Sequence, residues 1–108
     1  MYEIIKRQRI AQDGTMVDTF TREVEDGNIL QVEAGTTGYR EGEAEIGAVT
    51  YFRVADLEGT DITVRPLGED GNGGFEVVLH GDGGLYTVLT GLKFIVKVLE
   101  EESEEVYD

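Results

Sequence analysis

Few side chains in this sequence could perform catalysis. His80 is the only histidine, Ser103 is the only serine and cysteine is absent, whereas aspartate and glutamate together number 23. A Ser-His-Asp triad would have to recruit the serine near the C-terminus, and a metal site rich in histidine or cysteine is excluded. A pair of carboxylates stays open, because a sequence does not give the distance between two acids. We therefore expect no enzyme activity, no cofactor and no metal site.

The charge balance is the strongest global feature of the chain. Nine lysines and arginines stand against 23 acids, which gives a formal net charge of −14. Such a protein repels nucleic-acid phosphate and anionic lipid, and it attracts basic proteins. No apolar run approaches the roughly 18 residues of a membrane span, and the N-terminal residues lack the apolar core of a secretion signal. We expect a cytoplasmic protein with a basic protein partner and no direct contact with nucleic acid or membrane. Charge that serves solubility alone is the simpler alternative.

Three glycine-rich stretches resemble ligand-binding loops but lack the residues that such loops need. "GTTG" at 35–38 is followed by glutamates and by no helix, so it would repel a phosphate rather than hold one. "GEDGNGG" at 68–74 begins like a calcium loop, without the later glycine and glutamate of that motif. "HGDGG" at 80–84 lacks the third glycine of a dinucleotide-binding turn. We interpret the three as a long connection, a hairpin turn and the start of a helix.

Turn sequences recur at short intervals and separate segments that are rich in β-branched and aromatic residues. Asp-Gly and Asn-Gly steps tolerate the positive φ of tight turns. Alternation of apolar and polar side chains, as over 62–65, lets one side of a strand face a core while the other meets water. We predict six strands, at Tyr2–Ile10, Thr15–Val24, Ile29–Ala34, Ala48–Ala55, Asp61–Pro66 and Phe75–His80.

The apolar period lengthens from Leu85 onward, where apolar residues recur every three or four positions up to Leu99. This spacing predicts an amphipathic helix, with Asp82 as its N-cap and with unfavourable negative charge at its C-terminal end. The predicted fold class is α+β: an antiparallel meander of five to six strands with one C-terminal helix packed on one face. We expect a single domain over 1–102 and an acidic, disordered tail over 103–108.

A resemblance adds a direction to these expectations. The segments "ILQVEAGTTGYREGEAEIGAVTYFRV" and "GFEVVLHGDGGLYTVLTGLKFIVKVLEE" resemble small proteins of bacteria and their mobile elements. In size and acidity the whole chain is similar to phage-borne anti-defence proteins, including anti-CRISPRs. Some proteins of that class occupy nucleic-acid channels as charge mimics, so the resemblance implies an inhibitor of a nucleic-acid-binding protein.

Carboxylates on the loops would stand in for phosphates in such a mimic. The central stretch Glu33–Gly47 is expected to be a long, acidic and mobile connection, and such connections often carry function. The predicted partner-binding residues are Glu33, Glu41, Glu43, Glu45, Asp56, Glu58, Asp61, Glu69 and Asp70.

Two alternatives to this hypothesis stay open. The first is a small-ligand binder, in which aromatic faces and an arginine hold a nucleotide-like molecule at Tyr39, Tyr51, Phe52 and Arg53. The second is a structural module that forms a homodimer through a sheet edge or through the helix face.

Overall fold

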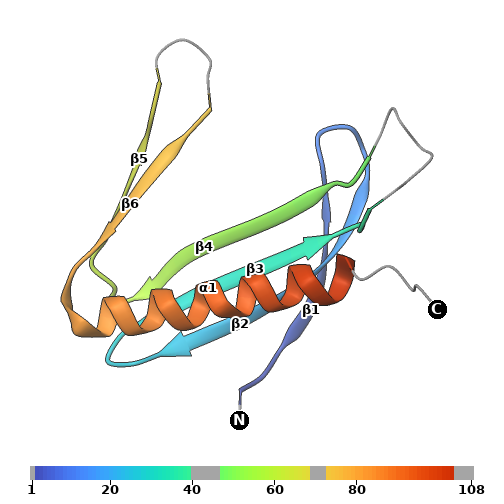
Figure 1. Ribbon diagram of the computed structural model, residues 1–108. Helices are drawn as coiled ribbons and strands as arrows, with labels where there is room; N and C mark the ends of the chain where they lie inside the picture. The colour runs from blue at the N-terminus through green and yellow to red at the C-terminus, as the bar shows by residue number, and fades with distance from the viewer. Residues whose placement is uncertain (1, 40–46, 69–72, 104–108) are drawn as a thin grey trace.

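Six strands and one helix build the fold in residues 2–39, 47–68 and 73–103, the part of the chain that the computed structural model describes (Figure 1). The predicted α+β meander with a C-terminal helix on one face is confirmed. The elements in chain order are β1 (Ile5–Ile10), β2 (Met16–Glu25), β3 (Ile29–Thr36), β4 (Thr50–Glu58), β5 (Ile62–Pro66), β6 (Phe75–Leu79) and α1 (Gly81–Ser103).

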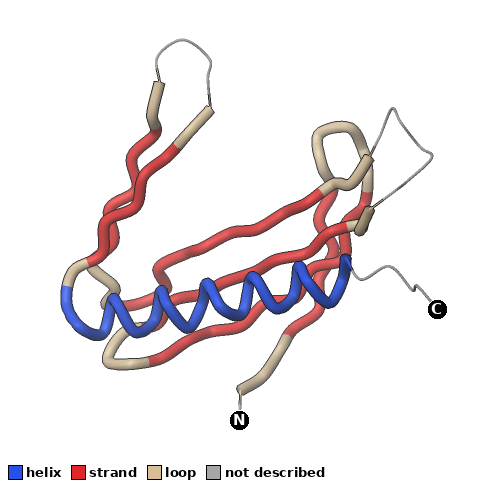
Figure 2. Tube along the Cα trace, viewed as in Figure 1, coloured by secondary structure: helices blue, strands red, loops and turns tan. Residues whose placement is uncertain are grey.

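The strands divide into two sheets. Strands β1 to β4 form an antiparallel sheet in chain order, and β5 pairs with β6 in a separate hairpin (Figure 2). The division occurs at Gly59, whose φ of +73° suits glycine, and at Thr60, which is buried. The Thr60 N–H donates a hydrogen bond of 3.1 Å to Asp56 Oδ1. This turn takes the chain out of the sheet, so β5 leaves β4 and the hairpin projects from the body.

The hydrophobic core lies between α1 and the two central strands, β2 and β3. Gly91 allows this close approach, because a Cβ at that position would lie 2.7 Å from Cγ1 of Val32. Burial of these side chains away from water is the main contribution to the stability of the fold. The core cluster consists of Leu30, Val32 and Ala34 from β3 and of Phe94, Ile95 and Val98 from α1.

Helix α1 begins four residues earlier than its apolar period indicates. Gly81 has a φ of +87° and starts the helix, so Asp82 lies in the first turn rather than at the N-cap. Its carboxylate still lies at the positive end of the helix dipole. The helix continues to Ser103, and residues 104–108 of the predicted tail lie outside the described residues. In the described part of the chain, no helix is both long enough and apolar enough to cross a membrane.

The four-stranded sheet curls toward the side that α1 leaves uncovered. Side chains from the two edge strands meet on this side: the guanidinium of Arg9 on β1 lies 5.7 Å from the ring centroid of Tyr51 on β4. The curl buries Val17, Thr19 and Thr21 on this side.

Candidate functional site

Carboxylates gather at the end of the molecule where α1 begins. In the ladder, Glu25 pairs with Ile29 and Ile29 pairs with Glu58, so the β2–β3 turn lies beside the end of β4. All the carboxylates at this end are exposed. We call them the acidic end: Glu25, Asp26, Asp56, Glu58, Asp61 and Asp82.

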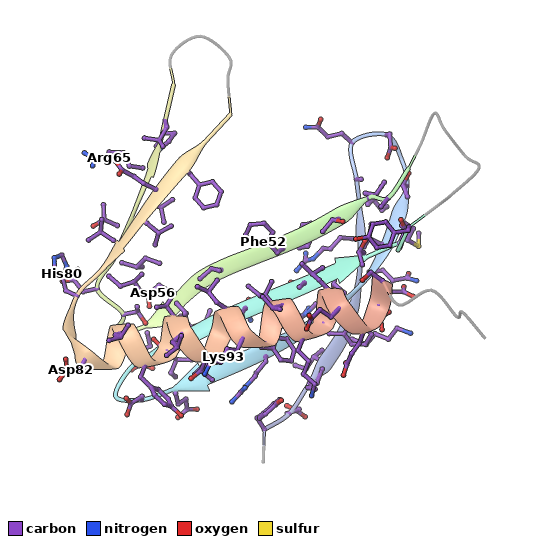
Figure 3. The ribbon with its side chains drawn as sticks, in the orientation of Figure 1. Phe52, Asp56, Arg65, His80, Asp82 and Lys93 are labelled. Atoms are coloured by element: carbon purple, nitrogen blue, oxygen red, sulfur yellow. The ribbon has the colours of Figure 1, made fainter. Side chains whose placement is uncertain are left out.

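The start of α1 and the base of the hairpin complete the acidic end. A Cβ on Gly83, in the first helical turn, would lie 2.8 Å from the carbonyl oxygen of Asp26. At the hairpin base, the His80 N–H donates a hydrogen bond of 3.2 Å to the carbonyl oxygen of Asp61. Figure 3 shows Asp56, His80 and Asp82 at this one end of the molecule. Residues from four different parts of the sequence therefore present carboxylates together.

Positive charge is sparse at the acidic end. One basic side chain among the described residues contacts it: His80 Nδ1 lies 3.3 Å from Asp61 Oδ2. No described group of three or more His, Asp or Glu side chains could hold a metal ion. The described lysines and arginines belong to the strands and to the C-terminal half of α1: Lys6, Arg7, Arg9, Arg22, Arg53, Arg65, Lys93 and Lys97. The acidic end thus presents separate carboxylates to solvent, which suits attraction of a basic surface.

The structure brings together three of the predicted partner-binding residues, Asp56, Glu58 and Asp61. Sequence reasoning missed Glu25, Asp26 and Asp82, although an antiparallel meander places the β2–β3 turn at the same end as the end of β4. The other predicted residues apart from Glu33 lie outside the described part of the chain: Glu41, Glu43, Glu45, Glu69 and Asp70.

The prediction that Glu33 lies on the partner-binding surface is wrong. Glu33 belongs to β3, and its side chain has no exposed surface. Arg9 Nε donates to Glu33 Oε2 and Arg9 Nη2 donates to Glu33 Oε1, both at 2.7 Å. Thr19 Oγ1 donates a third bond, of 2.5 Å, to Oε2. The bonds from Arg9, and secondarily the bond from Thr19, lower the pKa of Glu33 even though burial acts to raise it. Glu33 is therefore a paired internal anion.

The four residues of the nucleotide-like alternative do not form one site. Tyr51 and Arg53 lie on the curled side of β4, where Arg53 pairs across the ladder with Glu33. Phe52 pairs with the core residue Ala34 and so lies on the helix side (Figure 3). Tyr39 follows the end of β3 and is 70% exposed.

A second surface feature lies on the helix side of the sheet, next to β4. Leu99 lines a shallow hollow together with Ala48 and Thr50, near the start of β4. The flank of α1 that contains Leu99 is therefore the flank that faces β4. Phe94 and Lys97 lie on the other flank, beside Phe20. α1 packs on β2 and β3, so the helix side of β4 stays open and Phe52 is 50% exposed.

The hairpin extends this open surface. Its cross-strand pairs Ile62–Leu79, Val64–Val77 and Pro66–Phe75 are apolar and share one face. Ile62 packs against the core cluster, so this face is on the side of the body. Arg65 belongs to the opposite face, bonds to Glu76 and points away from β4 (Figure 3). Leu89, Leu92 and Val96 of α1 line one shallow hollow. We call the exposed apolar side chains on this side together the apolar trough: Phe52 from β4, Val64, Phe75 and Val77 from the hairpin, and Leu85, Leu89, Leu92 and Val96 from α1.

Large apolar side chains dominate the trough, and each is between 37% and 64% exposed. Clusters of exposed large apolar side chains mark interaction sites in folded proteins. The molecule therefore carries two distinct surfaces, one acidic and one apolar, that meet where α1 begins. Comparison with models of known protein families, with curated proteins and with solved structures finds no match to this chain, so the geometry alone must indicate what these surfaces do.

Proposed function

We propose that this protein is a non-enzymatic binding protein whose acidic end engages a basic surface of another protein. The observation that supports the proposal most is the gathering of six exposed carboxylates from the β2–β3 turn, the end of β4, the hairpin base and the start of α1. Charge concentrated at one place steers a basic partner toward it and increases the association rate. The net charge of −14 adds to this attraction at longer range.

The most concrete instance is an inhibitor of a nucleic-acid-binding protein, of the anti-defence kind that phages and mobile elements carry. The carboxylates would occupy phosphate positions in a cationic channel and displace the counterions there. Strand pairing holds Glu25, Glu58 and Asp56 in the sheet, so this array loses little conformational freedom on binding.

The test neutralises charge with substitutions of nearly equal shape. The variant Asp56→Asn/Glu58→Gln/Asp61→Asn removes three charges from the acidic end, and asparagine at 56 keeps an oxygen for the Thr60 N–H. The matched control Glu100→Gln/Glu101→Gln/Glu102→Gln removes three charges from the other end of α1. Both variants have the same net charge, so a difference between them reports the position of the charge.

The probe is a panel of guide-loaded RNA-guided nucleases, each tested for binding to its target DNA in the presence of this protein. We expect displacement of DNA from at least one nuclease, weakening at least about tenfold between about 50 and 200 mM salt. The acidic-end variant should lose about tenfold or more in potency, and the control should stay within about twofold. Displacement that salt does not weaken, or an equal loss in both variants, would contradict the proposal. No displacement from any nuclease would reject the anti-defence instance.

A further inference from the structure

Eight large apolar side chains of the apolar trough are exposed among the described residues, each between 37% and 64%. Clusters of exposed apolar side chains mark sites of protein–protein contact.

The hairpin is the part that most needs a covering partner. A two-stranded hairpin standing alone is marginally stable in water at best. On its apolar face, Val64 is 58% and Phe75 is 59% exposed, while Ile62 near the base packs against the core. A surface that covered this face would stabilise strands that the body supports at one end.

The exposed apolar stripe of α1 matches a second copy of itself. Leu85, Leu89, Leu92 and Val96 follow one another at intervals of four, three and four residues. This order of intervals is the same in both directions along the helix. Two antiparallel copies of α1 therefore align Leu89 with Leu92 and Leu85 with Val96 about a two-fold axis. Self-complementarity of this kind is what a two-fold dimer interface requires.

We propose that a second copy of this chain occupies the apolar trough, with the two α1 helices antiparallel and each hairpin covering the other copy. In this alignment Lys93 lies opposite Val88 and Lys97 lies opposite Gly84 of the second helix, so neither lysine lies opposite its own copy. Parallel packing would instead place Lys93 beside Lys93 and Glu100 beside Glu100, which is repulsive.

This inference is independent of the proposed function, because it rests on the apolar trough and not on the acidic end. The dimer proposal and the proposed function predict opposite effects of salt. Two chains of net charge −14 repel each other, and salt screens that repulsion, so the dimer should become tighter as salt is added. Binding of a basic partner should become weaker under the same change.

The experiment measures molar mass by sedimentation over a wide range of protein concentration, at low and high salt. We expect the wild type to reach twice 11.9 kDa, at lower protein concentration when salt is high. Leu89→Glu should raise the dimer dissociation constant at least about 100-fold, because the change occurs on both sides of the axis. The new carboxylate lies one turn before Lys93, which is a favourable spacing in a helix, so the variant should fold.

Two further variants complete the design. Val64→Glu on the hairpin should also raise the dissociation constant, which tests the contribution of the hairpin separately from that of the helix. Ile10→Glu makes the same kind of change at a side chain that is 71% exposed on β1, the opposite edge of the sheet, and should leave the mass unchanged. A wild type that stays monomeric, or a folded Leu89→Glu variant that dimerises like Ile10→Glu, overturns the proposal. The proposal is also overturned if the protein is a monomer and the apolar trough is required for binding a different protein, which would then be its occupant.

Discussion

The guanidinium of Arg9 on β1 holds the carboxylate of Glu33 on β3 through two hydrogen bonds of 2.7 Å, across the intervening strand β2. Thr19 of β2 contributes the third bond, so three strands meet at one carboxylate. Glu33 is fully buried, whereas the Arg9 side chain keeps 33% of its surface exposed. The other side chains of β1 are exposed, and this ion pair is therefore a principal attachment of β1 to the curled side of the sheet.

Removing Arg9 should destabilise the protein far more than removing a surface cation. Arg9→Met leaves a buried carboxylate without its partner, which costs about 3 kcal/mol. The matched control on the same strand is Lys6→Met, which breaks a 3.8 Å pair with Asp18 whose side chains are 63% and 46% exposed. Such a pair is worth less than about 1 kcal/mol. Urea unfolding of both variants measures the difference, and equal losses would contradict the role of Arg9. Arg9→Met/Glu33→Met should recover most of the lost stability, since no buried charge is then left.

The stability of the fold should decrease in acid because of Glu33. Its pKa in the folded protein is below the ordinary value of 4.5, so the unfolded chain takes up this proton first as the pH falls. The stabilisation is therefore complete above about pH 4.5 and is lost as the pH falls toward the lower pKa of the folded state. The free energy of unfolding of Glu33→Gln should vary less with pH over this range than that of the control Glu23→Gln, whose side chain is exposed on β2. Parallel curves for the two variants would disprove this assignment.

Gly91→Ala should destabilise the protein although alanine is the better helix former. Alanine in an exposed helix interior is worth about 1 kcal/mol over glycine. Here its Cβ would lie 2.7 Å from Cγ1 of Val32, a buried and conformationally stiff side chain, and such overpacking costs about 1–3 kcal/mol. Thermal unfolding should show a lower midpoint for Gly91→Ala and recovery in Gly91→Ala/Val32→Ala. A higher midpoint for the single variant would mean that the helix can move away from the sheet without cost.

The direction of helix packing in the dimer can be read from cross-linking, because the chain has no native cysteine. In the antiparallel arrangement, two copies of residue 92 lie about 4–5 Å apart along the helix axis, and two copies of residue 85 lie about 16 Å apart. A short bis-maleimide reagent should therefore link Leu92→Cys much more efficiently than Leu85→Cys, as gel electrophoresis would show. Efficient linking at both positions would indicate parallel helices instead.

The periodicities of the sequence predict most of the elements but not their ends. The apolar period indicates a later start for α1 because Gly81–Gly84 contains no apolar residue that could extend the period. The backbone of those glycines and the charge of Asp82 still suit a first helical turn. The sequence does not indicate the separation of β5 from β4, because this separation depends on Thr60, which bonds to Asp56 and reaches the carbonyl of Ile29 at 3.5 Å. That last contact spans distant parts of the chain and leaves no local signal.

The candidate site was predictable only in part for a similar reason. Asp56, Glu58 and Asp61 follow from turn chemistry near the end of a strand, and the antiparallel order would have added Asp26. Glu33 shows the limit of alternation. Glu33 shares a face of β3 with Gln31 and Gly35, and this pattern predicts a face in contact with solvent. The curl that brings Arg9 over Glu33 is a property of the assembled sheet and not of the β3 sequence.

The hairpin leaves the body after Gly59 and returns to it just before Gly81, and both glycines have positive φ, +73° and +87°. A ribbon fixed at its base in this way acts as a lever. A change of backbone angle at either glycine would be magnified along β5 and β6 and would move Phe75 relative to β4. The position of the far end of the hairpin therefore depends on these two turns and on the contact of Ile62 with the core cluster.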